Sequence, residues 1–229
     1  MNNKKPEHTD HWADFLSIAQ TYQPDLSVFY QWQKQRTSYA IWMYRFKQKK
    51  LIDTAQNIQK LLTQTFSIHL VKQLHMTVFV AGFPGSQIRY DDDIDASILE
   101  AQFQCLQSSK LNSPEIYIQK PCSTLTGPTL LTRDLTDTTD QIRSLFEQQA
   151  SEQRFSDYRP HITLGHYLNR YDTETVYQEL LDIPDFTPFI IKPYSLELVY
   201  INCSNPVDKK IAICNENYES IYTYYFENS

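Results

Sequence analysis

The chain has 229 residues, of which 41% are hydrophobic and 21% are charged. This composition is ordinary for a globular protein that builds its own core. The net charge of −6 argues against a broad surface for duplex DNA, because such surfaces are basic. No apolar run approaches the ~20 residues of a membrane helix, and the polar N-terminus has no secretory signal. We therefore expect a cytoplasmic protein that neither spans a membrane nor binds duplex DNA.

Cysteine and glycine usage excludes other kinds of site. The four cysteines show no Cys-x-x-Cys spacing, so neither a zinc site nor a disulfide framework is predicted. Four glycines are too few for a glycine-rich phosphate loop. The acidic run Asp91–Asp93 admits a divalent metal, but we prefer the start of a helix, where carboxylates stabilise unpaired N–H groups. The sequence predicts no metal and no cofactor.

Residues 1–37 are predicted to form an N-terminal helical extension. Trp12 and Phe15 are spaced for one helical face, and Phe29 lies in a second short helical pattern that follows Pro24. The pattern then changes to that of a strand over Ser38–Phe46.

The rest of the chain alternates strand and helix patterns. In the first half, a helix through Leu51 and Leu62 precedes an apolar strand, Leu74–Val80, which we expect to end at the breaker Gly82-Phe83-Pro84-Gly85. The second half repeats this order with strands, a helix through Ile142, another apolar strand and a helix capped by Asp172. Its predicted strands are Glu115–Lys120, Thr126–Thr132, Pro160–Leu164, Phe189–Lys192, Ser195–Ile201, Lys210–Asn215 and Ser220–Phe226.

Both apolar strands carry the pattern His-x-Thr, as His75-Met76-Thr77 and His161-Ile162-Thr163. Successive strand residues point to opposite faces, so each histidine shares a face with its threonine, roughly 6–7 Å away. An imidazole can then transfer a proton at a phosphate while the hydroxyl binds a phosphate oxygen. Taken singly, each residue also has a structural explanation, as a buried sheet histidine or a strand-forming threonine.

The two motifs resemble those of a known family. Leu74–Phe79 and Tyr158–Gly165 are similar to the paired motifs of the two-histidine (2H) phosphoesterase superfamily, and within it to bacterial RNA 2′,3′-cyclic phosphodiesterases (2′–5′ RNA ligase-like proteins). The resemblance implies that residues 38–229 form one two-lobed α+β domain. It further implies two antiparallel sheets that line a central cleft, helices outside, and a pseudo-twofold duplication.

The resemblance also implies an activity. His75 and His161 would be catalytic, and Thr77 and Thr163 would bind the substrate phosphate. The expected reaction is metal-independent hydrolysis of 2′,3′-cyclic phosphate ends of RNA or small nucleotides, by a monomer. Two alternatives stay open: the same site acting on another cyclic or 2′–5′-linked nucleotide, and a non-catalytic nucleotide-binding module.

Other residues near the motifs admit both structural and functional roles. We favour a structural or surface role for His69 and a surface role for Arg159 over phosphate binding. Gly165 either leaves room for substrate or kinks its strand. Three tyrosines are candidates for base stacking, although packing is the simpler interpretation: Tyr39, Tyr44 and Tyr167.

Overall fold

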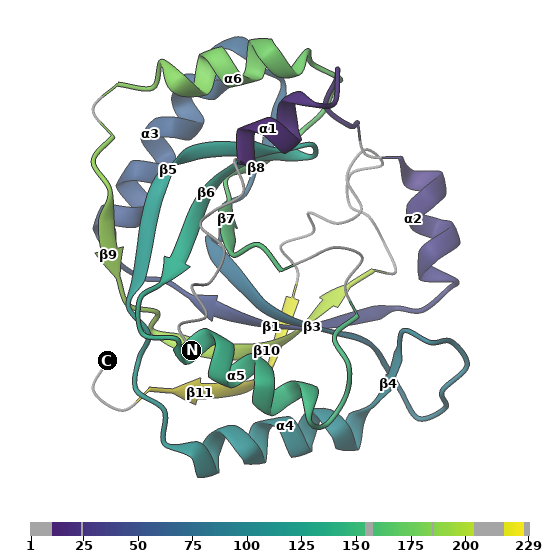
Figure 1. Ribbon diagram of the computed structural model, residues 1–229. Coiled ribbons are helices and arrows are strands. Elements are labelled where there is room, and N and C mark those ends of the chain that lie inside the picture. Colours follow the sequence, from purple (N-terminus) through teal and green to yellow (C-terminus); the bar gives the residue numbers. More distant parts are fainter. Residues whose placement is uncertain (1–10, 24, 154–157, 185, 204–217, 227–229) are drawn as a thin grey trace, which may run out of the picture.

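The computed structural model describes residues 11–23, 25–153, 158–184, 186–203 and 218–226. These residues form a mixed fold of helices and largely antiparallel sheets (Figure 1). In chain order the elements are α1 (His11–Leu16), α2 (Leu26–Gln33), β1 (Ser38–Arg45), α3 (Lys49–Thr65), β2 (Ile68–Leu70), β3 (His75–Gly85), β4 (Asp93–Asp95), α4 (Ala96–Ser109), β5 (Ile116–Thr124), β6 (Gly127–Asp134), α5 (Thr138–Glu147), β7 (His161–Thr163), β8 (Gly165–Tyr167), α6 (Thr173–Leu181), β9 (Phe189–Ile191), β10 (Ser195–Asn202) and β11 (Tyr218–Tyr225).

Two larger sheets and one small sheet make up the β-structure. The five-stranded sheet has the order β11-β10-β1-β3-β4, and the four-stranded sheet the order β7-β6-β5-β9. All their pairs are antiparallel except β3 with β4. The small antiparallel sheet pairs β2 with β8. The larger sheets meet where β3 contacts β7, so the two predicted motif strands are neighbours.

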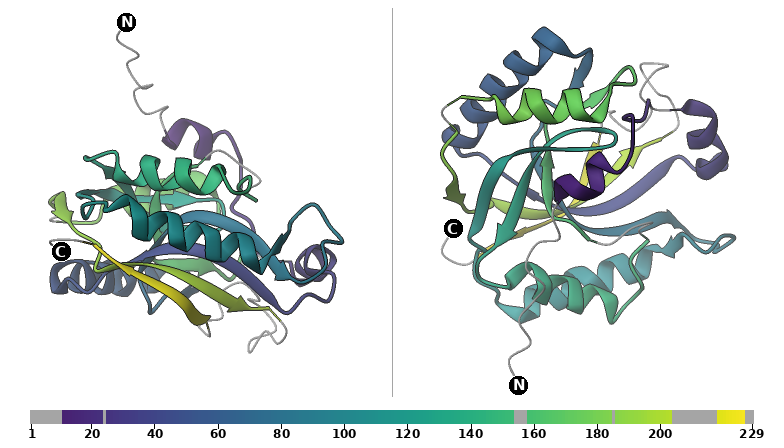
Figure 2. Two further views of the ribbon diagram at one scale, coloured as in Figure 1. Left: turned by 90° about the horizontal axis from the view of Figure 1, so that it is seen from below. Right: turned by 45° about the horizontal axis from the view of Figure 1, so that its top comes forward.

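Helices cover the sheets from outside. α4 and α5 lie side by side against the five-stranded sheet, whereas α6 and α1 pack on β5 of the four-stranded sheet (Figures 1 and 2). The predicted face of α3 is buried, with Leu51 fully enclosed and Leu62 at 4% exposure. One apolar cluster joins side chains from both large sheets and from the helices around them. The predicted α+β architecture, with antiparallel sheets inside and helices outside, is confirmed.

The predicted end of the first motif strand is wrong. β3 does not stop at Gly82 but continues to Gly85, because Phe83–Gly85 pair with β4 in parallel. Gly82 adopts a φ of 114°, which only glycine tolerates well, so it bends the strand without ending it. The amide of the next residue, Phe83, donates a hydrogen bond to the carbonyl oxygen of Asp92 at 2.8 Å.

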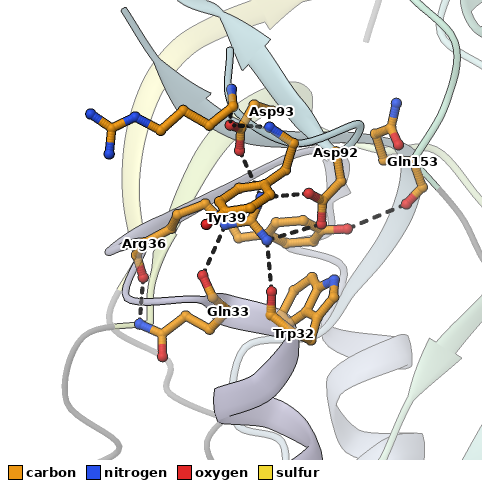
Figure 3. A network of polar contacts seen from close by, with 9 residues as sticks. Trp32, Gln33, Arg36, Tyr39, Asp92, Asp93 and Gln153 are labelled. Carbon is orange, nitrogen blue, oxygen red and sulfur yellow. Dashed lines mark hydrogen bonds and ion pairs between the residues drawn. The ribbon is translucent and has the colours of Figure 1, made fainter. Parts of the chain in front are cut away.

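The acidic run also has a different role from the predicted one. α4 begins at Ala96 and is capped by Asp95, whose carboxylate accepts a hydrogen bond from the Ser97 amide at 2.8 Å. Asp92 and Asp93 instead bind the Arg36 guanidinium, at 3.0 and 2.6 Å (Figure 3). Two of the three carboxylates of the run are therefore engaged by arginine, and they fasten the segment between β3 and β4 to the segment that follows α2.

The N-terminal segment packs onto the rest of the chain. Phe15 of α1 is buried in the main core at 4% exposure, and the Trp12 ring meets that of Tyr177 on α6, with centroids 4.8 Å apart. His11 Nε2 lies 2.8 Å from the carbonyl oxygen of Ser123 on β5. The predicted strand at Lys210–Asn215 lies outside the described residues. Within the described chain, every helix is too short or too polar to cross a bilayer.

Two glycines allow β2, β6 and β8 to approach closely. A Cβ on Gly127 would lie 1.9 Å from the carbonyl oxygen of Gly165, and a Cβ on Gly165 would lie 2.4 Å from Cγ2 of Ile68. The position beside Gly165 is therefore filled by β2 and is not open to a substrate.

We predict that Gly127→Ala lowers the free energy of unfolding by about 2–4 kcal/mol, because backbone atoms must move to admit the methyl group. Urea unfolding followed by circular dichroism measures this change. Gly85→Ala is the matched control, since the nearest atom to its Cβ is 3.6 Å away and ordinary contact costs little. Equal stability of the two variants would contradict the close approach.

Candidate active site

The two motif histidines have the same local setting. Each is the first residue of its strand, β3 for His75 and β7 for His161, and each residue is half-buried. Nδ1 of His75 lies 3.0 Å from the carbonyl oxygen of Gln73, and Nδ1 of His161 lies 2.7 Å from that of Arg159. A carbonyl can only accept, so Nδ1 carries the hydrogen in both rings, and Nε2 is the nitrogen that can take up or give a proton.

The threonines follow the predicted alternation. In β3, half-buried Thr77 stands between buried Met76 and buried Val78. In β7, half-buried Thr163 follows buried Ile162. Each threonine is thus on the same side of its strand as its histidine, and the apolar residues between them enter the core.

Three side chains that the sequence analysis missed hold the first motif strand in place. Arg143 on α5 donates to the carbonyl oxygen of Val78 at 2.7 Å and forms an ion pair with Glu152 at 2.7 Å. Its guanidinium also lies over the ring of Tyr158, 3.9 Å from the centroid. The Tyr158 hydroxyl in turn donates to the carbonyl oxygen of Thr77 at 3.2 Å. The segment that leads into the second motif is thereby tied to the first.

Only one of these three had a signal in the sequence. Tyr158 lies in the stretch that resembles the family motif, three residues before His161. Arg143 follows Ile142 in the helix pattern, and nothing in the sequence distinguishes it from a solvent-exposed helix arginine. Glu152 lies in a polar stretch without a pattern. Their role depends on tertiary packing, which a local pattern does not encode.

The other candidate residues have structural roles. The Arg159 side chain forms an exposed ion pair with Asp14 of α1, at 2.7 Å. Tyr44 and Tyr167 are buried, and their hydroxyls bond to Thr139 at 3.2 Å and Ser123 at 2.8 Å. These rings are not available for base stacking. The half-buried ring of Tyr39 packs on Trp32 and Phe83, and its hydroxyl donates to the Gln153 carbonyl oxygen at 3.3 Å.

A further histidine lies on β8, the strand that follows the second motif. His166 on β8 is directly opposite His69 on β2. Burial of its ring, together with the positive charges of His69, His75 and His161, lowers the pKa of His166 to about 4. Across the described ranges, no set of three or more His, Cys, Asp or Glu side chains is arranged to bind a metal ion.

The lowered pKa of His166 makes stability dependent on pH. Between about pH 4 and pH 6.5 the unfolded chain binds one more proton at this residue than the folded chain, so the free energy of unfolding falls as the pH decreases through this range. In His166→Gln the side chain at this position takes up no proton in either the folded or the unfolded chain. We expect the wild type to lose about 2 kcal/mol more than the variant between pH 7 and pH 4.5, as measured by urea unfolding. Parallel losses in the two proteins would contradict the burial of this ring.

Comparisons with known proteins support the fold. No protein-family model and no curated protein sequence matches the chain. Among solved structures, the chain is similar to a phosphoesterase, with a TM-score of 0.52 and 11% identity over 83% of this chain and 98% of the other. It is also similar to E. coli LigT complexed with NADP+, with a TM-score of 0.52, 12% identity and the same coverage. The protein TT0787 of Thermus thermophilus matches with a TM-score of 0.50, 12% identity and coverage of 82% and 97%.

These matches are too distant in sequence to carry an activity, but they extend over almost the whole of each solved chain. They agree with the α+β architecture that the resemblance of the two motifs to those of the 2H phosphoesterases implied. The chain therefore has the fold of LigT and of the phosphoesterase, the fold that this resemblance implied.

Proposed function

We propose that this protein is a metal-independent phosphodiesterase that hydrolyses 2′,3′-cyclic phosphate ends of RNA or small nucleotides. The observation that carries the proposal is the pair of His-x-Thr strands, each with its histidine Nδ1 bonded to a backbone carbonyl, in two strands that are in contact. The shared fold with a phosphoesterase and with LigT, which has been crystallised with 3′-AMP and NADP+, supports a nucleotide substrate. The cytoplasmic location and the monomeric state are part of the same proposal.

The chemistry needs two proton-transfer groups. A base takes a proton from the attacking water, while an acid protonates the sugar oxygen that leaves on the opposite side of phosphorus. His75 and His161 fill these roles through Nε2, one ring neutral and the other protonated. A histidine with an ordinary pKa near 6.5 supplies either form close to neutral pH.

The hydroxyls of Thr77 and Thr163 would bind the non-bridging phosphate oxygens. Negative charge accumulates on these oxygens in the transition state, so a fixed donor stabilises that state more than the ground state. Each threonine lies two residues after its histidine on the same face of the strand. At this spacing both side chains can contact the same phosphate.

Two alternatives use the same site. The chain could act on another cyclic or 2′–5′-linked nucleotide, or bind a nucleotide without turnover. The nucleotides in the LigT complexes are compatible with both. A substrate panel with chromatographic detection of products separates them: turnover of a 2′–5′-linked or differently cyclised nucleotide alone supports the first, and tight 3′-AMP binding without any turnover supports the second.

We predict that His75→Ala or His161→Ala abolishes detectable hydrolysis of a 2′,3′-cyclic nucleotide, because each removes a proton-transfer group. Initial rates from purified variants measure the loss. His11→Ala is the matched control, since His11 lies outside both motifs and bonds the backbone of Ser123 on β5, so this variant should retain turnover. Activity that survives in either motif variant would refute the assignment.

The reaction should have a bell-shaped pH–rate profile, because one histidine must be neutral and the other protonated. The profile should be unchanged by excess EDTA. Rates measured across roughly pH 5–9 with and without the chelator test this. Loss of activity in EDTA that returns with added metal would rule out the metal-independent reaction.

Thr77→Ala and Thr163→Ala should each lower the rate on the order of 10- to 1000-fold, as expected for the loss of one transition-state donor. Serine at either position keeps the hydroxyl and should recover much of the rate. Thr63→Ala on the exposed face of α3, where the hydroxyl bonds only within its own helix, controls for the substitution itself. Variants of Thr77 and Thr163 with wild-type rates would remove the phosphate-binding role.

A further inference from the structure

An arginine lies directly beside the first motif histidine. Arg45, the last residue of β1, is paired with His75, the first residue of β3, in an antiparallel ladder. Side chains of such directly opposed residues project from the same face of a sheet, with Cβ atoms ~4.5–5.5 Å apart. Arg45 therefore shares the face from which His75 and Thr77 project, although it belongs to neither motif.

The guanidinium of Arg45 is held by three neighbours. Its Nη2 donates to Oε1 of Gln73 at 3.0 Å, and its Nε lies 3.8 Å from the carboxylate of Glu197 on β10. It also lies over the ring of Tyr218 on β11, 4.9 Å from the centroid. Its Nη1 is buried, and no atom of the described residues accepts a hydrogen bond from it. An unpaired buried N–H costs free energy, so stability alone does not account for this guanidinium.

Gln73 connects this arginine to the histidine. Its side-chain oxygen accepts hydrogen bonds from Arg45 and from the Tyr218 hydroxyl. Because arginine can only donate, the Gln73 atom that it contacts is the amide oxygen. The backbone oxygen of the same glutamine accepts a hydrogen bond from Nδ1 of His75, at 3.0 Å. The residue that orients the histidine ring is thus itself bound by two side chains from other strands.

The position of Gln73 in the chain explains why this anchor matters. The residue is exposed and lies in the bend between β2 and β3, outside both strands. The ladder with β1 holds the chain from His75 onward, but one fixed end leaves the peptide before it with rotational freedom. The bonds to the Gln73 side chain supply a second fixed point, and together the two points restrict the direction of the carbonyl.

The second motif is anchored in a comparable way. Arg159 provides the carbonyl oxygen that accepts from Nδ1 of His161, and its side chain forms an ion pair with Asp14 at 2.7 Å. In both motifs, therefore, the residue that orients the ring is fixed through its side chain by a distant part of the sequence. The two anchors differ in chemistry but have the same geometric effect.

We propose that Arg45 is a positioning residue for His75. Together with Tyr218 it holds the side chain of Gln73, and thereby the carbonyl oxygen that keeps the ring hydrogen of His75 on Nδ1. Proton transfer then takes place through Nε2. The orientation of the ring depends on these contacts alone, whereas its catalytic effect depends on the proposed function.

Arg45→Met tests the proposal, because it removes the donors and keeps an unbranched side chain. For a 2′,3′-cyclic nucleotide, kcat should fall on the order of 10- to 100-fold while KM changes by less than about threefold, since a misoriented histidine impairs chemistry more than binding. Arg45→Lys can still donate to Gln73 and should recover part of the rate. A raised KM with unchanged kcat would overturn the proposal, because it indicates that Arg45 contacts the substrate.

Arg89→Met is the matched control. Nη2 of Arg89 makes the same type of bond, to Oε1 of Gln87 at 2.9 Å, beyond the other end of β3. This variant should retain the wild-type kcat. A loss equal to that of Arg45→Met would overturn the proposal, because the effect would then not depend on the contact with Gln73.

Gln73→Leu tests whether Arg45 acts through Gln73. It removes the acceptor at an exposed position, so it remains informative if Arg45→Met fails to fold. Its kcat should fall as far as that of Arg45→Met. The double variant should be no slower than the slower single variant, because both substitutions interrupt the same contact. Losses that multiply in the double variant would indicate two independent effects and overturn the proposal.

Nitrogen NMR of the imidazole rings separates this inference from the proposed function. Above the ordinary titration range of histidine, His75 in the wild type should carry its hydrogen on Nδ1. In Arg45→Met and Gln73→Leu the ring should become a mixture of both tautomers. A ring that keeps the Nδ1 tautomer in both variants overturns the inference even if their turnover is slow. If the wild type hydrolyses no phosphodiester but the tautomer changes as described, the positioning role stands and the proposed function fails.

Discussion

Two backbone carbonyl groups govern what the motif histidines can do. Those of Gln73 and Arg159 accept a hydrogen bond from Nδ1 of the histidine two residues later. Each bond fixes the tautomer and the ring plane of the histidine. The acceptor is a main-chain oxygen, and the adjoining strand holds that part of the main chain in place. A carbonyl carries no net charge, so it orients the ring without pulling a proton toward it as a carboxylate would. Both rings can consequently exchange protons through Nε2.

The rest of the fold keeps the two strand beginnings together. β3 lies between β1 and β4 in the five-stranded sheet, and β7 is an edge strand of the four-stranded sheet. A hydrogen bond from the Tyr158 hydroxyl to the carbonyl oxygen of Thr77 joins the two motif segments directly. On the other side, Gln59 ties β2 to the residue between β7 and β8. Every one of these links ends on a backbone carbonyl. The positions of the motif strands are therefore secured even where their side chains face outward.

The sequence predicted the parts of the structure that local periodicity determines. The apolar face of α3, the cap of α6 at Asp172 and the alternation around Thr77 are each encoded within a few neighbouring residues. The predicted end of β3 was wrong because Gly82, with its positive φ, bends the strand without ending it. The residues after the bend remain in the sheet because they pair with β4. The acidic run was misread because Arg36, 56 residues away from Asp92, determines its role. The sequence did not predict roles for His166 and Arg143 for the same reason, because their partners belong to other elements.

The docking of α1 has a consequence for how the chain folds during synthesis. Trp12 and Phe15 leave the ribosome before the surfaces that bury them, which belong to β5, beginning at Ile116, and to α6, beginning at Thr173. At roughly 5–20 residues per second, α1 must wait on the order of ten seconds or more before both surfaces exist. During that interval its apolar side chains are exposed to chaperones and to other nascent chains, and α1 can join the native core only after both surfaces have been synthesised.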